Sequence, residues 1–463
     1  MENKELNRMK KPKMAALLSS VIWGGGQFYN KQSAKASFFF MFQCVLIGIE
    51  LLTGHYFTGI ESFRDCGFFI RGFWGVITLG TETSILTEQG LTAGDHSVML
   101  LIQGIISVLI LSIFIAIWII NIRDAYQTAI EINKNGKISS VKWLKNTWEN
   151  SFEYIMMIPA AIMLMLFILM PIIFSALVAF TNYDIHNMPP ANLLEWVGLT
   201  NFTSLFSLGG TTSGRGNIWL YTFKNVFIWT LLFALILTIV PFFIGLLQAI
   251  ILNNKRIKGK RFWRSILILP WAMPAIISQL NFQQIFNGQF GPLNRFLIER
   301  GILESPILWL SDPHNPWLPR MTILFIGIWL GFPYFMALTS GSMSSISKDI
   351  YEAAEVDGAN ASQQFWKITL PLVLATTAPL LIMSFAFNFN NFGMIYFLTG
   401  GGPMNPGFIH AGQTDILISW IFTLTMTERM YNMASVMSLI IFLVIGTLSA
   451  WNFARTKSFQ EEG

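Results

Sequence analysis

Eight stretches of the chain are apolar and long enough to cross a lipid bilayer as helices. The hydrocarbon layer of a membrane requires roughly 20 mostly apolar residues per helix. These stretches are residues 36–54, 97–120, 155–180, 226–252, 265–284, 321–343, 372–398 and 433–453. Only 12% of the 463 residues are charged, whereas about a quarter are charged in a typical soluble domain. The sequence therefore predicts an all-α polytopic membrane protein with eight transmembrane helices.

Lysine and arginine indicate how these helices are oriented. With the N-terminus inside the cell, the cytoplasmic segments are 1–35, 121–152, 253–264, 344–369 and 454–463, and they hold 22 of the 30 Lys and Arg. The excess of positive residues in cytoplasmic loops therefore predicts that both termini are cytoplasmic. The densest basic block, Lys255 to Arg261, lies in one of these short loops, which favours membrane topology over a nucleic-acid site.

The sequence lacks the common motifs for nucleotide binding, hydrolysis and metal binding. It has no glycine-rich phosphate-binding loop, no GxSxG and no HExxH. Its two cysteines form no CxxC pair, and its five histidines are widely spaced. We expect a transport subunit rather than an enzyme, with no catalytic residue, no metal site and no cofactor bound by this chain.

The interiors of the predicted spans contain no Asp, Glu, Lys, Arg or His. Intramembrane ionisable groups usually serve ion or proton pathways, so their absence disfavours proton coupling and favours an uncharged solute. The seventh span instead carries Ser384, Phe387, Asn388 and Asn391, whose spacing places them on one helical face. This stripe either forms interhelical hydrogen bonds or lines a cavity for a polar solute.

Aromatic residues in neighbouring spans favour a sugar as that solute. Trp271 lies in the fifth span, and Trp329 and Tyr334 lie in the sixth. Aromatic rings stack on the apolar face of a sugar, while amides bind its hydroxyl groups. Aromatic residues near span ends also serve as ordinary membrane-interface anchors.

Residues 346–371 form a polar unit between the sixth and seventh spans. Ser347 is suited to cap a first helix, and Gly358 is suited to end it. Asn360 and Gln363 have the spacing of a capping box that opens a second helix, which we expect to run to Pro371. The residues themselves leave two interpretations open, an acidic connector or a docking unit for a partner protein.

The run EAAEVDGANASQQFWKITLP resembles the EAA signature of binding-protein-dependent ABC importer permeases. The matching residues are Glu352, Ala353, Ala354, Gly358, Ile368, Leu370 and Pro371. In that family this loop forms coupling helices that sit in a cleft of the ATPase subunit. The resemblance therefore implies that Glu352, Ala353, Ala354 and Gly358 contact an ATPase.

Further motifs resemble the carbohydrate-uptake branch of the family, particularly the larger permease subunit of maltose/maltodextrin importers. They are AFTNYD, WVGLTNF, LPWAMP, FNGQFGPLN, WLGFPY, SFAFNFNNF and LTGGGP, and they cover residues 155–455. By position, the resemblance implies that sugar is bound by Trp271, Leu330, Gly331, Tyr334, Ser384, Phe387, Asn388 and Asn391. It also implies a six-helix type I core formed by spans three to eight.

This sequence departs from the family pattern in several places. Trp271 replaces a tyrosine, Ala275 replaces a small polar residue, and Gly327-Ile328 replaces a polar residue before WLG. The loop 182–217 is short, as in relatives from Gram-positive bacteria, whereas the enterobacterial protein has a folded insertion there. The Gly-rich segment Gly24–Gln32 also departs, and we interpret it as a surface-lying or re-entrant piece.

Together these features predict three regions. Residues 1–150 would hold the N-terminal segment and two accessory spans, residues 151–455 the permease core with a transmembrane domain at about 220–452, and residues 456–463 a cytoplasmic tail. The expected function is to form half of the pathway of an ATP-driven importer for maltose or maltodextrin. The alternatives are another neutral sugar, such as a multiple-sugar or galactoside substrate, and a stand-alone secondary transporter.

The resemblance also implies the partners and location of the chain. It implies a second homologous permease subunit, an ATPase homodimer that uses ATP-Mg, an extracellular sugar-binding lipoprotein and the oligosaccharide. We expect contact with membrane lipid but not with nucleic acid. The expected location is the cell membrane of a bacterium, and the short loop 182–217 favours a Gram-positive one.

Overall fold

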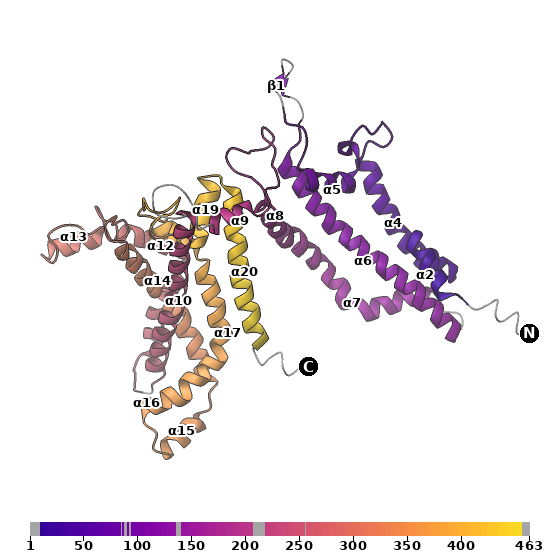
Figure 1. Ribbon diagram of the computed structural model, residues 1–463. Helices are drawn as coiled ribbons and strands as arrows, with labels where there is room; N and C mark the ends of the chain where they lie inside the picture. Colours follow the sequence, from indigo (N-terminus) through magenta and orange to yellow (C-terminus); the bar gives the residue numbers. More distant parts are fainter. Residues whose placement is uncertain are drawn as a thin grey trace, which may run out of the picture. The chain divides into compact units, whose positions relative to one another are not determined.

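The computed structural model describes residues 10–84, 86–87, 90–91, 94–135, 140–206, 218–254 and 256–455. The predicted tail 456–463 and Lys255 of the basic block lie outside this range. The chain packs as two compact units, Met1–Gly198 and Leu199–Gly463, which are coloured indigo to magenta and magenta to yellow in Figure 1. The first unit contains the third predicted span, so its assignment to the permease core stays a prediction.

The first unit is helical apart from a two-residue hairpin. Its elements are α2 (Pro12–Val21), α3 (Gly25–Tyr29), α4 (Ser33–Thr53), a 3₁₀ turn (Phe63–Asp65), α5 (Phe68–Thr78), β1 (Leu86–Thr87), β2 (Gly90–Leu91), α6 (Ser97–Asn135), α7 (Ser140–Leu164), a π-helical turn (Met165–Leu169) and α8 (Met170–Val178). The two strands pair antiparallel, with Leu86 opposite Leu91.

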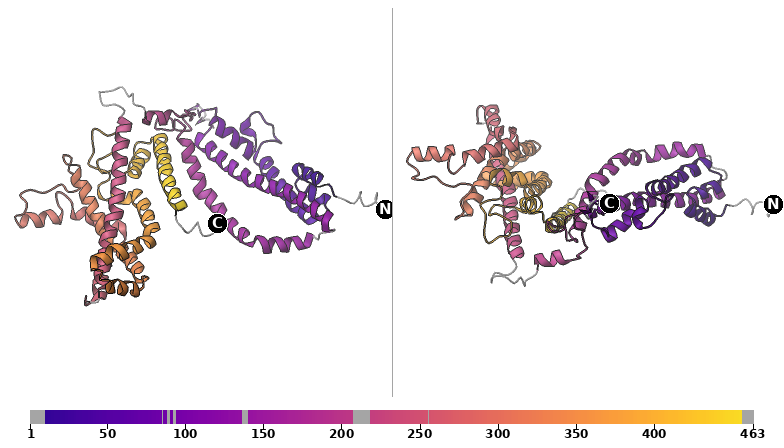
Figure 2. Two further views of the ribbon diagram at one scale, coloured as in Figure 1. Left: turned by 60° about the horizontal axis from the view of Figure 1, so that its bottom comes forward. Right: turned by 90° about the horizontal axis from the view of Figure 1, so that it is seen from above.

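The second unit consists of helices in its described part. They are α9 (Thr200–Phe206), α10 (Ile218–Asn253), α11 (Lys260–Ala272), α12 (Ala275–Ile285), α13 (Pro292–Glu299), α14 (Trp317–Ser344), α15 (Lys348–Val356), α16 (Ala361–Gln364), a π-helical turn (Phe365–Thr369), α17 (Leu370–Phe389), α18 (Phe392–Leu398), α19 (Leu417–Met426) and α20 (Tyr431–Arg455). Figure 2 shows α13 projecting away from the other helices of this unit.

Six helices in the described part of the chain are long and apolar enough to cross a membrane. They correspond to predicted spans one to four, six and seven. The fifth span is a broken pair, α11 and α12, bent by 89°. The eighth corresponds to α20, a helix of 25 residues. A polytopic all-α protein is thus confirmed, while the count of eight and the cytoplasmic termini stay predictions.

Helix α6 organises the first unit. Helix α5, which lies between the first two predicted spans, packs along it through Gly72 and Gly75. A side-chain carbon at Gly72 would lie 2.3 Å from the Ser107 hydroxyl, so the close approach requires glycine there. The Gly-rich segment, whose role the sequence left open, forms α3 and also packs against α6.

Helix α10 forms the centre of the second unit and packs extensively against α14. A core of buried apolar side chains, including Phe233, Leu237 and Ile323, joins α10, α14 and α18. The approach of α10 to α14 is close at Gly245, where a side-chain carbon would lie 2.5 Å from the Met336 amide nitrogen. This packing supports the wall of the pocket described next.

Candidate functional site

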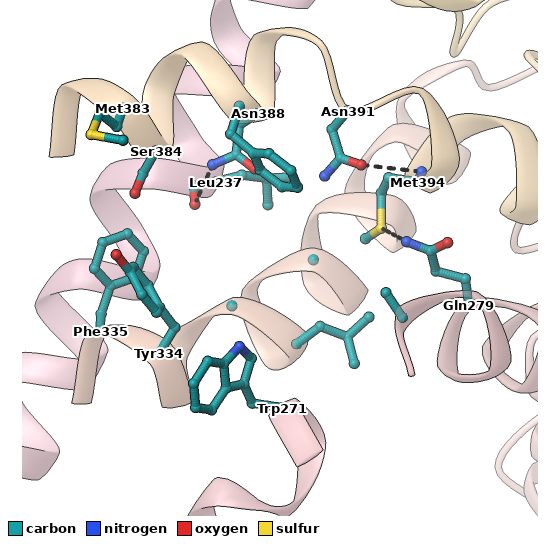
Figure 3. A pocket seen from close by; sticks show the side chains of 15 residues that line it. Leu237, Trp271, Gln279, Tyr334, Phe335, Met383, Ser384, Asn388, Asn391 and Met394 are labelled. Carbon is teal, nitrogen blue, oxygen red and sulfur yellow. Dashed lines mark hydrogen bonds between the residues drawn. The ribbon is translucent and has the colours of Figure 1, made fainter. Parts of the chain in front are cut away.

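A pocket of about 480 Å³ lies among α10, α11, α12, α14, α17 and α18 (Figure 3). Its volume falls within the range of small-molecule sites. All eight residues that the resemblance assigned to sugar binding line it: Trp271, Leu330, Gly331, Tyr334, Ser384, Phe387, Asn388 and Asn391. The structure therefore brings together residues from three predicted spans, while their role in binding stays a prediction.

The break between α11 and α12 opens one side of this pocket. Met273 has extended backbone angles and Pro274 begins the next helix. A residue before proline disfavours the helical conformation, and proline has no amide hydrogen to continue the helix. Residues 265–284 therefore form a broken pair of helices and not the single continuous helix expected. Because of the bend, Trp271 and Ala275 both reach the pocket from opposite sides of the break.

Aromatic rings form one part of the pocket wall. The ring centroids of Trp271 and Tyr334 are 6.2 Å apart, and Figure 3 shows the Tyr334 hydroxyl directed toward Ser384. Trp271 is 55% exposed and Phe387, on α17, is 70% exposed. Exposed rings beside hydroxyl groups provide stacking surfaces for a sugar face.

The polar side of the pocket differs from the predicted single stripe. Helix α17 ends at Phe389, so Asn391 is not on the same helix as Ser384, Phe387 and Asn388. Asn391 instead caps α18, where its Oδ1 accepts a hydrogen bond from the Met394 amide at 3.3 Å. The prediction of one continuous helical face is wrong at this residue, although all four side chains still reach the pocket.

Asn388 combines the two roles that the sequence left as alternatives. Its Nδ2 donates to the carbonyl oxygen of Leu237 at 3.2 Å and to Thr238 Oγ1 at 3.1 Å, both on α10. These bonds join α17 to α10, as expected for interhelical packing. The side chain also lines the pocket, while its contact with a solute stays a prediction.

Gln279 on α12 belongs to the pocket but was not singled out in the sequence. It is only 6% exposed, and its Nε2 lies 3.7 Å from the sulfur of Met394. Its Oε1 is buried without a hydrogen-bond partner. Buried polar atoms are nearly always paired, so this amide marks a place for a donor. The available signal was a glutamine inside an apolar stretch.

No residue of the pocket wall carries a charge. Its polar groups are the Tyr334 and Ser384 hydroxyls, the Trp271 indole N–H and the amides of Gln279, Asn388 and Asn391. An ionised solute buried in such a pocket would lack a counter-charge and pay a large desolvation cost. The arrangement is chemically suited to a neutral polyhydroxylated molecule.

The polar unit between α14 and α17 contains the two predicted helices. Ser347 caps α15 by accepting from the Asp349 amide, and Asn360 and Gln363 form both bonds of the capping box that opens α16. Gly358 follows α15 with φ of +75°, a left-handed conformation in which glycine carries no steric cost. These local predictions are confirmed.

The second helix of this unit does not end at Pro371. Residues 361–389 form one apolar helical segment, interrupted only by the π-helical turn. Proline is tolerated at Pro371 because it is the second residue of α17, directly after that turn. The predicted end of the second helix at Pro371 is therefore wrong, and α16 leads through the π-helical turn into the helix that carries Ser384 and Asn388.

Helix α15 presents an accessible surface. Glu352 and Ala353 are exposed and Ala354 is half-buried. Val356 is 88% exposed, and no atom lies within 4 Å of a side-chain carbon placed at Gly358. Acidic and small apolar groups thus share one exposed end of the unit, which leaves space for a partner to approach.

The glycines of LTGGGP have a structural role at the opposite end of α18. Gly401 has φ of +87°, and a side-chain carbon there would lie 2.3 Å from Asp415 Oδ1. Asp415 accepts hydrogen bonds from the Gly412 amide and the Ser419 hydroxyl, both at 2.7 Å. Burial raises the pKa of Asp415 to about 6. This loop is a buried element of the fold.

Comparisons with known proteins complete the assignment. Residues 242–456 match the family described as binding-protein-dependent transport system inner membrane component. The chain is 38% identical to the galactooligosaccharides transport system permease protein GanP of Bacillus subtilis, over 97% of this chain and 99% of that protein. The chain belongs to this family of ABC importer permeases.

Other members of the family show the breadth of their cargo. The permease is 37% identical to the maltodextrin transport system permease protein MalC of Streptococcus pneumoniae, over 99% of both chains. It is 41% identical to the maltose/maltodextrin permease MalF of Vibrio cholerae, over 52% of this chain and 45% of that protein. As a sugar importer permease it is a transport subunit of the cell membrane and not an enzyme.

The fold is shared with solved importers. The structure of a bacterial ABC transporter for the acidic polysaccharide alginate matches with a TM-score of 0.54, at 21% identity, over 68% of this chain and 99% of that chain. A second alginate transporter structure, in complex with a pentasaccharide-bound periplasmic protein, matches with a TM-score of 0.53 at 22% identity. At these identities the likeness concerns the fold alone.

Proposed function

We propose that the permease forms half of the translocation pathway for a neutral oligosaccharide, with the pocket around Trp271 and Asn388 as its sugar site. The observation that carries this proposal is the uncharged wall of exposed aromatic rings and amides. We propose maltose or maltodextrin as the cargo, in line with the names of MalC and MalF.

A galactooligosaccharide is the second candidate cargo. The relative GanP carries that name and is as similar as the maltodextrin permeases. Trp271 and Ala275, which depart from the maltodextrin pattern, both line the pocket. Maltodextrins and galactooligosaccharides both consist of sugar rings with hydroxyl groups, and they differ in the geometry of their linkages. We propose that the position of the Trp271 indole ring determines which linkage geometry fits the pocket.

For coupling, we propose that α15 docks on an ATPase subunit through Glu352, Ala353, Ala354 and Gly358. The helical segment from Ala361 to Phe389 supports a lever mechanism, because a displacement of the docked unit would reach Ser384 and Asn388 along this one segment. Switching by rigid movement of helices is a common form of conformational change.

The same proposal includes the partners. The chain would act with a second homologous permease subunit, an ATPase homodimer that consumes ATP-Mg and an extracellular binding lipoprotein, in a Gram-positive membrane with both termini cytoplasmic. We propose that the chain itself binds no cofactor. The family and the exposed α15 surface support this assembly.

Uptake by the assembled importer in proteoliposomes tests the cargo. Radiolabelled maltotriose and a galactotriose are offered with ATP inside and binding protein outside. ATP-dependent accumulation of maltotriose in preference to galactotriose is expected, and the reverse preference would establish the second candidate. Sugar flux through the purified chain alone, without ATPase subunits, would refute the ABC mechanism.

A further inference from the structure

The N-terminal hook, residues 12–32, folds back onto the ends of α4 and α6 (Figure 1). Buried polar contacts fix it there. Gln27 accepts from the Ser19 hydroxyl at 2.9 Å and donates to Asp124 of α6 at 3.1 Å. Asn121 of α6 donates to the Ser19 carbonyl oxygen at 2.9 Å and accepts from the Gly24 amide at 3.1 Å. The hook is therefore a rigid part of the first unit.

A second pocket, of about 960 Å³, lies between this hook and the first turns of α4. Apolar side chains form most of its wall, among them Leu18, Ile22, Phe28 and Phe40. Phe28 is 72% exposed, Ile22 54% and Phe40 50%. Aromatic and aliphatic groups this exposed beside a membrane-spanning helix are placed to contact an acyl chain.

One edge of the pocket is polar. Lys31 lies there in a left-handed turn with φ of +60°, and its ammonium group has no acidic partner among the described residues. Ser33 and Ser37 follow on α4, one helical turn apart. A lysine and two hydroxyls are the donor types that bind a phosphate.

The charge around the pocket favours an anion. Residues 10–37 contain five lysines and no Asp or Glu. Asp124 of α6, which contacts the hook through Gln27, is paired with Lys35 at 2.8 Å. Lys10 donates to the Tyr29 carbonyl oxygen. Lys31 is thus the cation left at the pocket edge, in a surrounding field that is positive.

The polar and apolar parts of the pocket follow one another in the order of a lipid headgroup and its acyl chain. Its polar edge lies at the start of α4, where this span enters the membrane, and its apolar wall extends one to two turns further to Phe40. On α2, the exposed residues Met14, Leu17 and Val21 share one face. Lys11 and Lys13 lie at the start of this helix, and an exposed apolar face beside basic residues suits the membrane interface.

We propose that this pocket binds one anionic phospholipid. Its phosphate is held by Lys31, Ser33 and Ser37, and one acyl chain lies along Ile22, Phe28 and Phe40. The lipid fixes the hook to the start of α4. This inference depends on α4 crossing the membrane and is independent of the cargo of the importer.

Native mass spectrometry of the purified full-length chain tests the proposal, with phosphatidylglycerol or phosphatidylcholine as the added lipid. The unaltered chain is expected to retain one phosphatidylglycerol in preference to phosphatidylcholine. Lys31→Asn, which tolerates the left-handed turn, should weaken that adduct about fivefold. Lys31→Arg should preserve it, and Lys134→Asn, which removes an exposed lysine at the end of α6, should leave it unchanged.

A second variant tests occupancy of the pocket by filling it without altering charge. Ser37→Trp places an indole in the pocket and should displace the lipid while melting temperature is kept. Equal retention of both lipids, or equal weakening by Lys31→Asn and Lys134→Asn, would overturn the proposal, since either result indicates unspecific adhesion. A chain dimer in place of a lipid adduct would also overturn it, because the hook would then be a self-association surface.

Discussion

Tyr351 and Thr369 share a hydrogen bond between their hydroxyl groups at 2.9 Å. Tyr351 belongs to α15, and Thr369 ends the π-helical turn that precedes α17. This bond ties the proposed ATPase-docking helix to the segment that leads to the pocket. A movement of α15 is therefore passed on by a direct contact as well as through the chain.

Tyr351→Phe should reduce coupling. Loss of one such hydrogen bond costs about 1 kcal/mol, which leaves the fold intact but weakens the link between α15 and α17. We expect a lower ratio of sugar transported to ATP hydrolysed by the reconstituted importer. Tyr396→Phe, on a half-exposed tyrosine of α18, is the control, and equal ratios in both variants would contradict the prediction.

Gly358→Ala should lower ATP-driven uptake without unfolding the chain. A side chain at Gly358 meets no atom within 4 Å, so the cost is the left-handed backbone, about 1–2 kcal/mol. The measurement is uptake together with the amount of ATPase subunit that co-purifies. Gly341→Ala, equally unobstructed but within helix α14, should leave both quantities unchanged. Loss of uptake in the Gly341 variant but not in the Gly358 variant would contradict a specific role of Gly358 in ATP-driven uptake.

Glu352→Lys should weaken association with the ATPase subunit and leave membrane insertion of the chain unchanged. The side chain is exposed, so reversing its charge leaves the packing of α15 intact. Co-purification of ATPase measures the effect. Glu304→Lys, an exposed acid in another loop, is the control, and undiminished uptake in the Glu352 variant would refute docking through this residue.

Gln279→Leu should weaken sugar binding without lowering the stability of the folded chain. The buried Oε1 of Gln279 has no hydrogen-bond partner, so replacing the amide with an apolar side chain of similar size should leave the melting temperature unchanged or higher. Sugar affinity, measured as the KM of uptake, should weaken about fivefold if one hydrogen bond of roughly 1 kcal/mol is lost. Gln284→Leu, on the exposed side of α12, provides the comparison. A lower melting temperature with unchanged KM would assign Gln279 a structural role.

The permease should lose stability as pH rises through the titration of Asp415. Its pKa is raised by burial from 3.8 to about 6 in the folded chain, so the folded state binds the proton more tightly than the unfolded state. The resulting stability is complete below pH 3.8 and is lost as pH rises through 6, on the order of 3 kcal/mol in all. Melting temperatures in detergent between pH 5 and 7.5 measure it. Asp415→Asn should flatten this slope, and an equally steep slope in that variant would point to another group.

Local signals predicted the parts of the fold that depend on neighbouring residues. The cap at Ser347, the box at Asn360 and the turn at Gly358 each need only residues within four positions, and each formed as expected. The eight proposed sugar residues came from the family resemblance. Helical spacing contributed only the stripe on the seventh span.

Features that depend on competition between backbone and side chains were missed. The end of α17 at Phe389 carries no glycine or proline signal. It occurs where Asn391 bonds to the Met394 amide, because asparagine competes with the helix for backbone hydrogen bonds. Helices α5 and α19, of 11 and 10 residues, are too short to register as spans. Tertiary burial of residues such as Trp420 stabilises them.

The helix end at Phe389 has a consequence for how cargo is released. Asn388 is anchored to α10, whereas Asn391 is anchored to α18. The distance between the two amides therefore depends on the angle between α17 and α18. If a bound sugar contacts both amides, any change in the angle between α17 and α18 would alter the spacing of the amides and therefore the affinity of the pocket for its cargo.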